Sequence, residues 1–318
     1  MPLTTDEKLL TLSRDTIEGF DKANGGVHPG FRPAHAKGIL LTGTFTPSKE
    51  ALSLTCAPHI QRPSTPVTVR LSDFAGIPTV PDNDQQGASP RGCAIRFHLD
   101  EHVHTDIVAH SVDTFPSRTA EGFLEFLNAL IATDPSGPHP NAIEQFLGAH
   151  PAALAFVQAP KPFPTSFAKE SFFAVSAFKF GNANGGSRFG RYRILPVAGN
   201  EYLDDAAAAA QTPNFLFDEL KDRIAKGPVK YRIVVQLAQE GDTTDDATVR
   251  WPEDRPQLAL GEITLTAIAP DNPTEQQRLI FDPIPRVDGI EASADPLFEP
   301  RANVYLLSGR RRGAAGNQ

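Results

Sequence analysis

Two short segments near opposite ends of the 318-residue chain contain side chains that could carry chemistry. Toward the carboxyl end, Arg301 and Tyr305 are four positions apart, so on a helix the guanidinium and the phenol would share one face and reach each other. A free tyrosine has a pKa of about 10, but a neighbouring cation favours the phenolate, which is a hard anionic ligand suited to ferric iron. By itself, this spacing is also typical of an ordinary surface pair.

The second segment runs from Arg32 to Gly38 and contains His35. Histidine takes up or delivers a proton near neutral pH, and an arginine three positions earlier can hold an anion. Taken alone, the segment is more typical of a hydrogen-bonded histidine at the edge of a strand. Its chemistry therefore depends on what the fold places beside it.

The local patterns predict a fold that combines strands with helices. Alternating apolar and β-branched residues bounded by turn signals predict strands, and apolar residues repeated at helical spacing predict helices. The expected strands cover residues 36–45, 67–71, 93–99, 104–108, 172–180, 188–195, 229–237 and 258–268, and the expected helices cover residues 5–20, 119–133, 141–150, 214–225 and 295–312. Because strands are spread along the whole chain, we expect a single barrel surrounded by helices, of the α+β class, rather than two separable domains.

Composition narrows the functional classes. The 29 prolines are about 9% of the chain against an average of about 5%, so long uninterrupted helices cannot dominate. A formal net charge of −8 argues against a nucleic-acid partner, since binding a phosphate backbone needs a clustered positive surface. No apolar stretch is long enough for a signal peptide or a membrane span. We therefore expect a cytoplasmic protein that neither binds nucleic acid nor spans a membrane.

Further motifs, in chain order, connect the two segments. The segment with Arg301 and Tyr305 follows Gly289–Pro296 and closely resembles the haem-ligand segment of the haem catalases, while Arg32–Gly38 resembles their distal-histidine strand. The other matching motifs are Gly43-Thr44-Phe45, Val69-Arg70-Leu71-Ser72, Asp82 with Pro90-Arg91-Gly92-Cys93-Ala94, Arg223–Lys230, Val235-Gln236-Leu237 and Trp251-Pro252. The resemblance covers about residues 20–312, and it is closest to the short catalase-related peroxidases.

This resemblance implies a fold, a cofactor and a set of site residues. The fold would be a catalase-like eight-stranded antiparallel β-barrel with surrounding helices, forming one haem-binding domain over residues 1–318 without a C-terminal helical domain. A b-type haem would lie between barrel and helix, with His35 as the distal acid and base and with Tyr305 as the iron ligand, held as tyrosinate by Arg301. Ser72 would hydrogen-bond His35, and Phe123 would stack on the porphyrin. The haem propionates would pair with Arg32, with Arg70 and with one of Arg310 and Arg312, for which Arg312 is the candidate. For Phe123, plain packing within the helix core is an equal alternative.

Departures from the family pattern favour a peroxidase over a catalase. Where catalases have Asp-Leu-Val-Gly-Asn-Asn, residues 106–111 read Asp-Ile-Val-Ala-His-Ser, which puts Ser111 in the place of the asparagine over the iron. Serine reaches less far than an amide, so the step that orients a second peroxide should suffer most. Catalases also continue beyond the ligand helix into an arm and a helical domain, and without these the haem edge should be open to larger molecules.

The sequence thus predicts a haem peroxidase that reduces hydrogen peroxide or organic peroxides with a small organic electron donor and has weak or no catalase activity. Two alternatives remain open: rearrangement of lipid hydroperoxides by an allene oxide synthase-like isomerase, and a haem-binding sensor or carrier with negligible turnover. The histidines at 98, 102 and 104 resemble a divalent-metal cluster, although their position at a turn makes this interpretation the weakest. The resemblance leaves a homodimer open.

Overall fold

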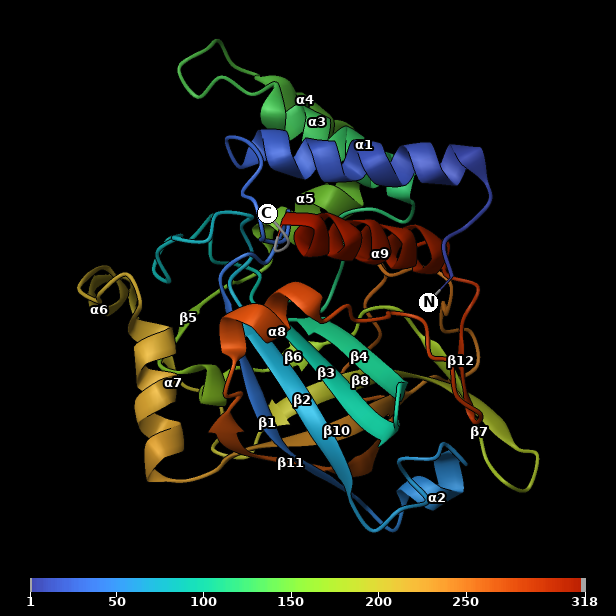
Figure 1. Ribbon diagram of the computed structural model, residues 1–318. Coiled ribbons are helices and arrows are strands. Elements are labelled where there is room, and N and C mark those ends of the chain that lie inside the picture. Colours follow the sequence, from blue (N-terminus) through green and yellow to red (C-terminus); the bar gives the residue numbers. More distant parts are fainter. Residues whose placement is uncertain (1, 316–318) are drawn as a thin grey trace.

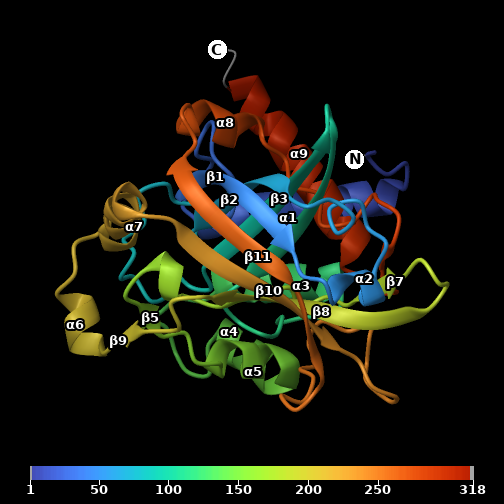
Figure 2. The same cartoon turned by 90° about the horizontal axis from the view of Figure 1, so that it is seen from below.

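The computed structural model describes residues 2–315, and its centre is a closed antiparallel β-barrel (Figure 1). Each strand of the barrel pairs with the next, and β8 pairs with β10 to complete the ring. In ring order the eight strands are β1 Gly38–Pro47, β2 Thr65–Ser72, β3 Gly92–Asp100, β4 Val103–His110, β6 Phe172–Phe173, β8 Ser187–Pro196, β10 Val229–Leu237 and β11 Gln257–Ile268. The ring closes between distant parts of the chain, since β1 lies beside β11 (Figure 2). The predicted eight-stranded barrel is confirmed.

Four further short strands of residues 2–315 lie outside this ring. β7 and β12 extend the sheet beyond β8, and β5 and β9 form a separate pair. Their bounds are β5 Phe163–Pro164, β7 Phe178–Gly181, β9 Tyr202–Leu203 and β12 Ile290–Ala292.

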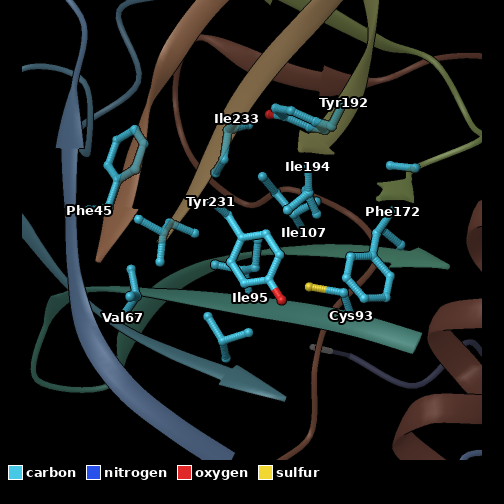
Figure 3. Packing of buried hydrophobic residues seen from close by; sticks show 14 of the residues in the cluster. Phe45, Val67, Cys93, Ile95, Ile107, Phe172, Tyr192, Ile194, Tyr231 and Ile233 are labelled. Carbon is cyan, nitrogen blue, oxygen red and sulfur yellow. The ribbon is translucent and has the colours of Figure 1, made fainter. Parts of the chain in front are cut away.

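The barrel interior is a packed apolar core. Side chains alternate across each strand, so every second residue points inward. In Figure 3, Ile95, Ile107 and Ile233 surround the ring of Tyr231. The buried Tyr231 hydroxyl donates a hydrogen bond to the Phe167 carbonyl oxygen at 2.6 Å, which satisfies the one polar atom of that side chain. The barrel is therefore a scaffold, and any ligand must bind outside this core.

Five helices form a layer beyond one end of the barrel, where α1 and α9 run close together and α3, α4 and α5 lie next to them, whereas α7 lies at the side of the barrel (Figure 1). Asp6 caps α1, and the Arg311 guanidinium on α9 pairs with Asp21 on α1. The helices are α1 Glu7–Ala23, α2 Ala51–Leu54, α3 Ala120–Ile131, α4 Ala142–Ala149, α5 Pro151–Gln158, α6 Asp205–Ala209, α7 Phe215–Lys226, α8 Asn272–Arg278 and α9 Phe298–Ala315, with a 3₁₀ turn at Phe167–Lys169.

The structure differs from the expected elements in two places. The predicted strand 172–180 is divided into β6 and β7, because Phe173 and Phe178 are five residues apart while their partners on β8, Arg193 and Gly190, are only three apart. The two extra residues leave 174–177 outside the ladder. Directly after the expected helix 141–150, Pro151 begins a further helix, α5, which the sequence patterns did not predict; proline is tolerated at the first helical position because its missing N–H would have no intrahelical partner there.

Candidate functional site

A cavity of about 1090 Å³ is lined by the ends of β2, β3 and β4 on one side and by residues of α1, α3, α5 and α9 on the other. It brings together residues from both ends of the chain. The sequence-predicted residues that line it are His35, Ser72, Arg32, Arg70, Phe123, Arg301, Tyr305 and Arg312. Ser111 is not among its lining residues. His35 and Tyr305, about 270 positions apart in sequence, thus face one cavity.

His35 lies in the loop that leads into β1 and is held from several sides. Its backbone has a φ of 58°, a left-handed conformation that is uncommon for a residue with a side chain. The ring nitrogen Nδ1 is 3.1 Å from Ser72 Oγ, and Phe74 packs edge-on against the ring at 5.5 Å. A Cβ atom on Gly92 would come within 2.8 Å of Nδ1, so only glycine leaves room for this ring. The strained backbone is therefore fixed by its surroundings.

The surroundings of His35 also set its protonation. Burial, followed by the positive charge of Arg70, lowers the pKa of this imidazole to about 3, and a backbone hydrogen bond to Asp73 only partly opposes the shift. Ser72 holds one ring nitrogen, which leaves Nε2 for a ligand. At neutral pH the ring is uncharged, so it is able to accept a proton.

Three arginines concentrate positive charge at one end of the cavity. Arg32 donates from Nη1 and Nη2 to the carbonyl oxygens of Gln276 and Leu279, at 3.0 Å each, and Arg312 donates from Nη2 to the same Leu279 oxygen at 3.0 Å. Arg70 donates from Nε to Gln276 Oε1 at 2.9 Å. All their hydrogen-bond acceptors are neutral.

The charges of these arginines are not balanced within the protein. Burial lowers the pKa of Arg70 to about 9 and that of Arg312 to about 10, and burial together with the charge of Arg70 lowers the pKa of Arg32 well below its usual value. Within residues 2–315 none of the three forms an ion pair with a carboxylate. Buried charges are normally paired, so this end of the cavity suits a ligand with anionic groups.

Helix α9 presents one continuous face to the cavity. Arg301, Tyr305, Ser308 and Arg312 all line it, at the four- and three-residue steps that keep side chains on one side of a helix. Arg310 is exposed on another face. Arg312 is therefore the member of the C-terminal arginine run that reaches the cavity. In the described part of the chain, no hydrogen bond joins Arg301 to Tyr305.

An aromatic wall completes the cavity. The Phe123 ring on α3 stacks on Phe115, with the ring centres 5.2 Å apart, and it also contacts Phe20 on α1 at 5.7 Å. All three rings line the cavity. Phe123 thus takes part in helix packing and also faces the space that a planar ligand would fill.

The sequence interpretation missed His110, which lines the cavity at the end of β4. The neighbouring Ser111 is engaged elsewhere, because its Oγ accepts a hydrogen bond from the backbone N–H of Arg91 at 2.9 Å. His110 is the last residue of β4, whereas Ser111 follows the strand and does not line the cavity. The alternation that places Val108 and His110 on one face was a signal that the sequence carried.

The histidines near the β3–β4 turn lie away from this cavity. His98 is exposed on the outer face of β3, and its Nε2 is 2.9 Å from Thr68 Oγ1. His102 is exposed in the turn. No group of three or more metal-ligating side chains forms within residues 2–315.

Comparisons with known proteins agree with this architecture. A family model described as catalase matches residues 16–318. A catalase-related peroxidase of Mycolicibacterium paratuberculosis (strain ATCC BAA-968 / K-10) is 34% identical over 317 residues, which cover 98% of this chain and 95% of the relative. A second catalase-related peroxidase, from Synechococcus elongatus (strain ATCC 33912 / PCC 7942 / FACHB-805), is 34% identical over 291 residues, 90% of this chain and 85% of the relative.

The fold is also found among solved structures. A fungal catalase superposes with a TM-score of 0.77 at 22% identity, covering 98% of this chain and 64% of the fungal chain. The chain thus spans a little under two thirds of that structure. Among the described helices, none has both the length and the apolar character that crossing a membrane requires.

Proposed function

The chain belongs to the catalase family, and from its site we propose that it is a haem-dependent peroxidase, which reduces hydrogen peroxide or organic peroxides with electrons from a small organic donor. The observation that carries the proposal is the single cavity with His35 on one side and Tyr305 on the other. The two relatives with the highest identity reported above are named catalase-related peroxidases, which favours peroxide reduction over hydroperoxide rearrangement or haem carriage.

The residues present fit a b-type haem. Three guanidiniums without carboxylate partners in residues 2–315, two of them buried and that of Arg32 half-buried, suit the two propionates, so we assign Arg32, Arg70 and Arg312 to them. Tyr305 would ligate the iron, with Arg301 on the same helix face favouring the phenolate, and Phe123 would pack on the porphyrin. When bound, the haem supplies the iron that takes up the oxidising equivalents of the peroxide.

The side chain that would transfer the peroxide proton is His35. His35, neutral and with Nδ1 against Ser72, would accept a proton at Nε2 from one oxygen of the peroxide and return it to the other oxygen, which leaves as water or as an alcohol. Ser72, Phe74 and the space above Gly92 hold the ring, so little reorganisation accompanies the transfer. Ser111 is hydrogen-bonded outside the cavity lining, so we assign it no direct role in this transfer.

Steady-state kinetics on the haem-loaded protein test this proposal. We expect oxidation of a phenolic donor that depends on peroxide, with little release of oxygen from peroxide alone. Replacing His35 with Gln should lower kcat/KM for peroxide by about 10²- to 10⁴-fold, whereas His98→Gln, a histidine on the outer face of the barrel, should not change it. Formation of an allene oxide from a fatty-acid hydroperoxide without a donor, or turnover equal to that of free haemin, would overturn the proposal.

A further inference from the structure

One row of residues at the end of the barrel brings two imidazoles together. In the strand register, Gly92 is directly opposite Ser72 on β2 and directly opposite His110 on β4. Opposite residues of antiparallel strands carry their side chains on the same face, with Cβ atoms about 5 Å apart. Because Gly92 has no side chain, the ring of His35 occupies that position, as shown by the 2.8 Å between its Nδ1 and a Cβ built on Gly92. His35 therefore lies between Ser72 and His110.

One hydrogen bond of the His110 ring indicates which nitrogen carries its proton. Nδ1 accepts a hydrogen bond from the backbone N–H of Val112 at 3.3 Å. In a neutral imidazole one nitrogen accepts and the other donates, so the proton is on Nε2. Burial, followed by the charge of Arg301, lowers the pKa of His110 to about 3, which keeps the ring neutral. Within residues 2–315, Nε2 makes no hydrogen bond.

The two rings consequently offer opposite functions to the same cavity. His35 presents a nitrogen that accepts a proton, and His110 presents an N–H that donates a hydrogen bond. A hydroperoxide R–O–O–H has a proton to give on one oxygen and lone pairs on both. A donor beside an acceptor therefore matches this molecule, because the protonated oxygen can face His35 while a lone pair accepts the hydrogen bond from His110.

We propose that His110 is a second catalytic imidazole, which donates a hydrogen bond from Nε2 to the peroxide oxygen nearer β4 while His35 receives the proton. This inference rests on the proposed peroxidase function. His110 keeps its own proton throughout, so the proton that His35 removes is the one returned to the departing oxygen. Ser111 is not placed for this role, because it does not line the cavity and its Oγ lies against the backbone N–H of Arg91.

Cyanide binding by the haem-loaded protein provides a test that does not depend on turnover. Hydrogen cyanide gives its proton to His35, and the bound anion then accepts a hydrogen bond from His110. His110→Phe retains a flat ring but removes the donor, so we expect the dissociation constant for cyanide to rise about 3- to 10-fold, the value of one hydrogen bond. His110→Gln retains an N–H donor and should stay within about twofold of the wild type, and His98→Gln should be unchanged.

Nitrogen NMR of the haem-free full chain at pH 7 tests the geometry separately. We expect the His110 ring to show an unprotonated Nδ1 and a protonated Nε2. The opposite tautomer would overturn the inference, as would equal cyanide affinity in His110→Phe and the wild type, or equal losses in the Phe and Gln variants. If the wild type fails to take up haem, the proposed function is wrong. If the wild type binds haem and reduces peroxide, and His110→Phe binds cyanide as tightly as the wild type, only the role of His110 is contradicted.

Discussion

The two walls of the cavity are built in different ways. On the strand side, His35, Ser72 and His110 come from three separate segments, and hydrogen bonds within the protein already hold each of them. On the helix side, Arg301, Tyr305 and Arg312 come from one face of α9, and in the described residues the Tyr305 hydroxyl makes no hydrogen bond and Arg312 has no anionic partner.

This difference separates two tasks. On the strand side, hydrogen bonds at Nδ1 fix the two imidazoles and leave Nε2 for a ligand, so this wall can orient a small substrate without reorganising its side chains. A wall with unpaired groups gains most from a ligand that supplies the missing partners. We therefore expect substitutions of His35, Ser72 or His110 to slow the reaction and leave haem binding intact, and substitutions of Tyr305 or Arg312 to weaken haem binding.

The largest effect should come from the strand wall. His35→Gln removes the proton acceptor, so kcat/KM for peroxide should fall about 10²- to 10⁴-fold while one haem per chain is still retained. Stopped-flow absorption after mixing with peroxide, together with a haem assay, measures both quantities. Loss of haem in parallel with activity would contradict the separation of the two walls.

The next effect should come from α9. Tyr305→Phe removes the proposed iron ligand, and we expect haem affinity to fall by on the order of 100-fold. Tyr202→Phe is a matched control, since the Tyr202 hydroxyl contacts Glu170 and Asn200 outside the cavity. Competition for haemin with apomyoglobin compares the variants. An unchanged haem affinity in Tyr305→Phe would show that Tyr305 does not ligate the haem iron.

Placing a side chain at Gly92, on the strand wall, should also lower kcat/KM, but less than His35→Gln does. An alanine at Gly92 would place its Cβ 2.6 Å from Ser72 Oγ and 2.8 Å from His35 Nδ1, so the His35 ring must move. A displacement of about 1 Å can cost up to about 100-fold, and we expect a 10- to 100-fold loss in kcat/KM with haem content unchanged. Gly148→Ala serves as the control, because nothing lies within 4 Å of a Cβ there. Equal activity in Gly92→Ala would show that the position of His35 is not critical.

A single propionate contact should contribute less. Arg312→Gln removes one charge-assisted contact, so haem affinity should fall about 10-fold, whereas Arg310→Gln on the exposed face should have no effect. The same haemin competition distinguishes them. A loss in the Arg310 variant alone would assign the contact to the other arginine.

The buried His59 in the barrel core should make the free energy of unfolding depend on pH, without affecting turnover at neutral pH. His59 is buried between Phe45 and Phe97 with both ring nitrogens unpaired, and burial lowers its pKa to about 4. The unfolded chain, with a histidine pKa of about 6.5, binds the proton more readily, so stability is lost as pH falls from about 6.5 toward 4, by about 2 kcal/mol at pH 5. Urea unfolding of the wild type and of His59→Leu measures this loss, and identical pH slopes would contradict it.

Residues on one helix were the easiest to predict from sequence. The spacing of Arg301 and Tyr305 predicts a shared face, and the seven residues from Tyr305 to Arg312 keep that face, so helical periodicity alone favours Arg312 over Arg310. The closed barrel followed from strands spread along the chain and from the family resemblance.

Residues on strands were harder to assign. A shift of one residue moves a side chain to the opposite face of a sheet, so the choice between Ser111 and His110 depended on where the strand ends and how it pairs. The pairing of Gly92 with Ser72 and His110, and the ring of His35 above it, join segments that are far apart in sequence. The division of the predicted strand 172–180 likewise depended on its register with β8.

The most direct test of the account is the resonance Raman spectrum of the purified, haem-loaded protein. If haem lies between His35 and Tyr305, the wild type and Tyr202→Phe should show vibrations of a tyrosinate bound to high-spin ferric iron, and Tyr305→Phe should lack them. A protein that takes up no haem, or one whose iron is ligated by histidine and whose spectrum is unchanged in Tyr305→Phe, would contradict it.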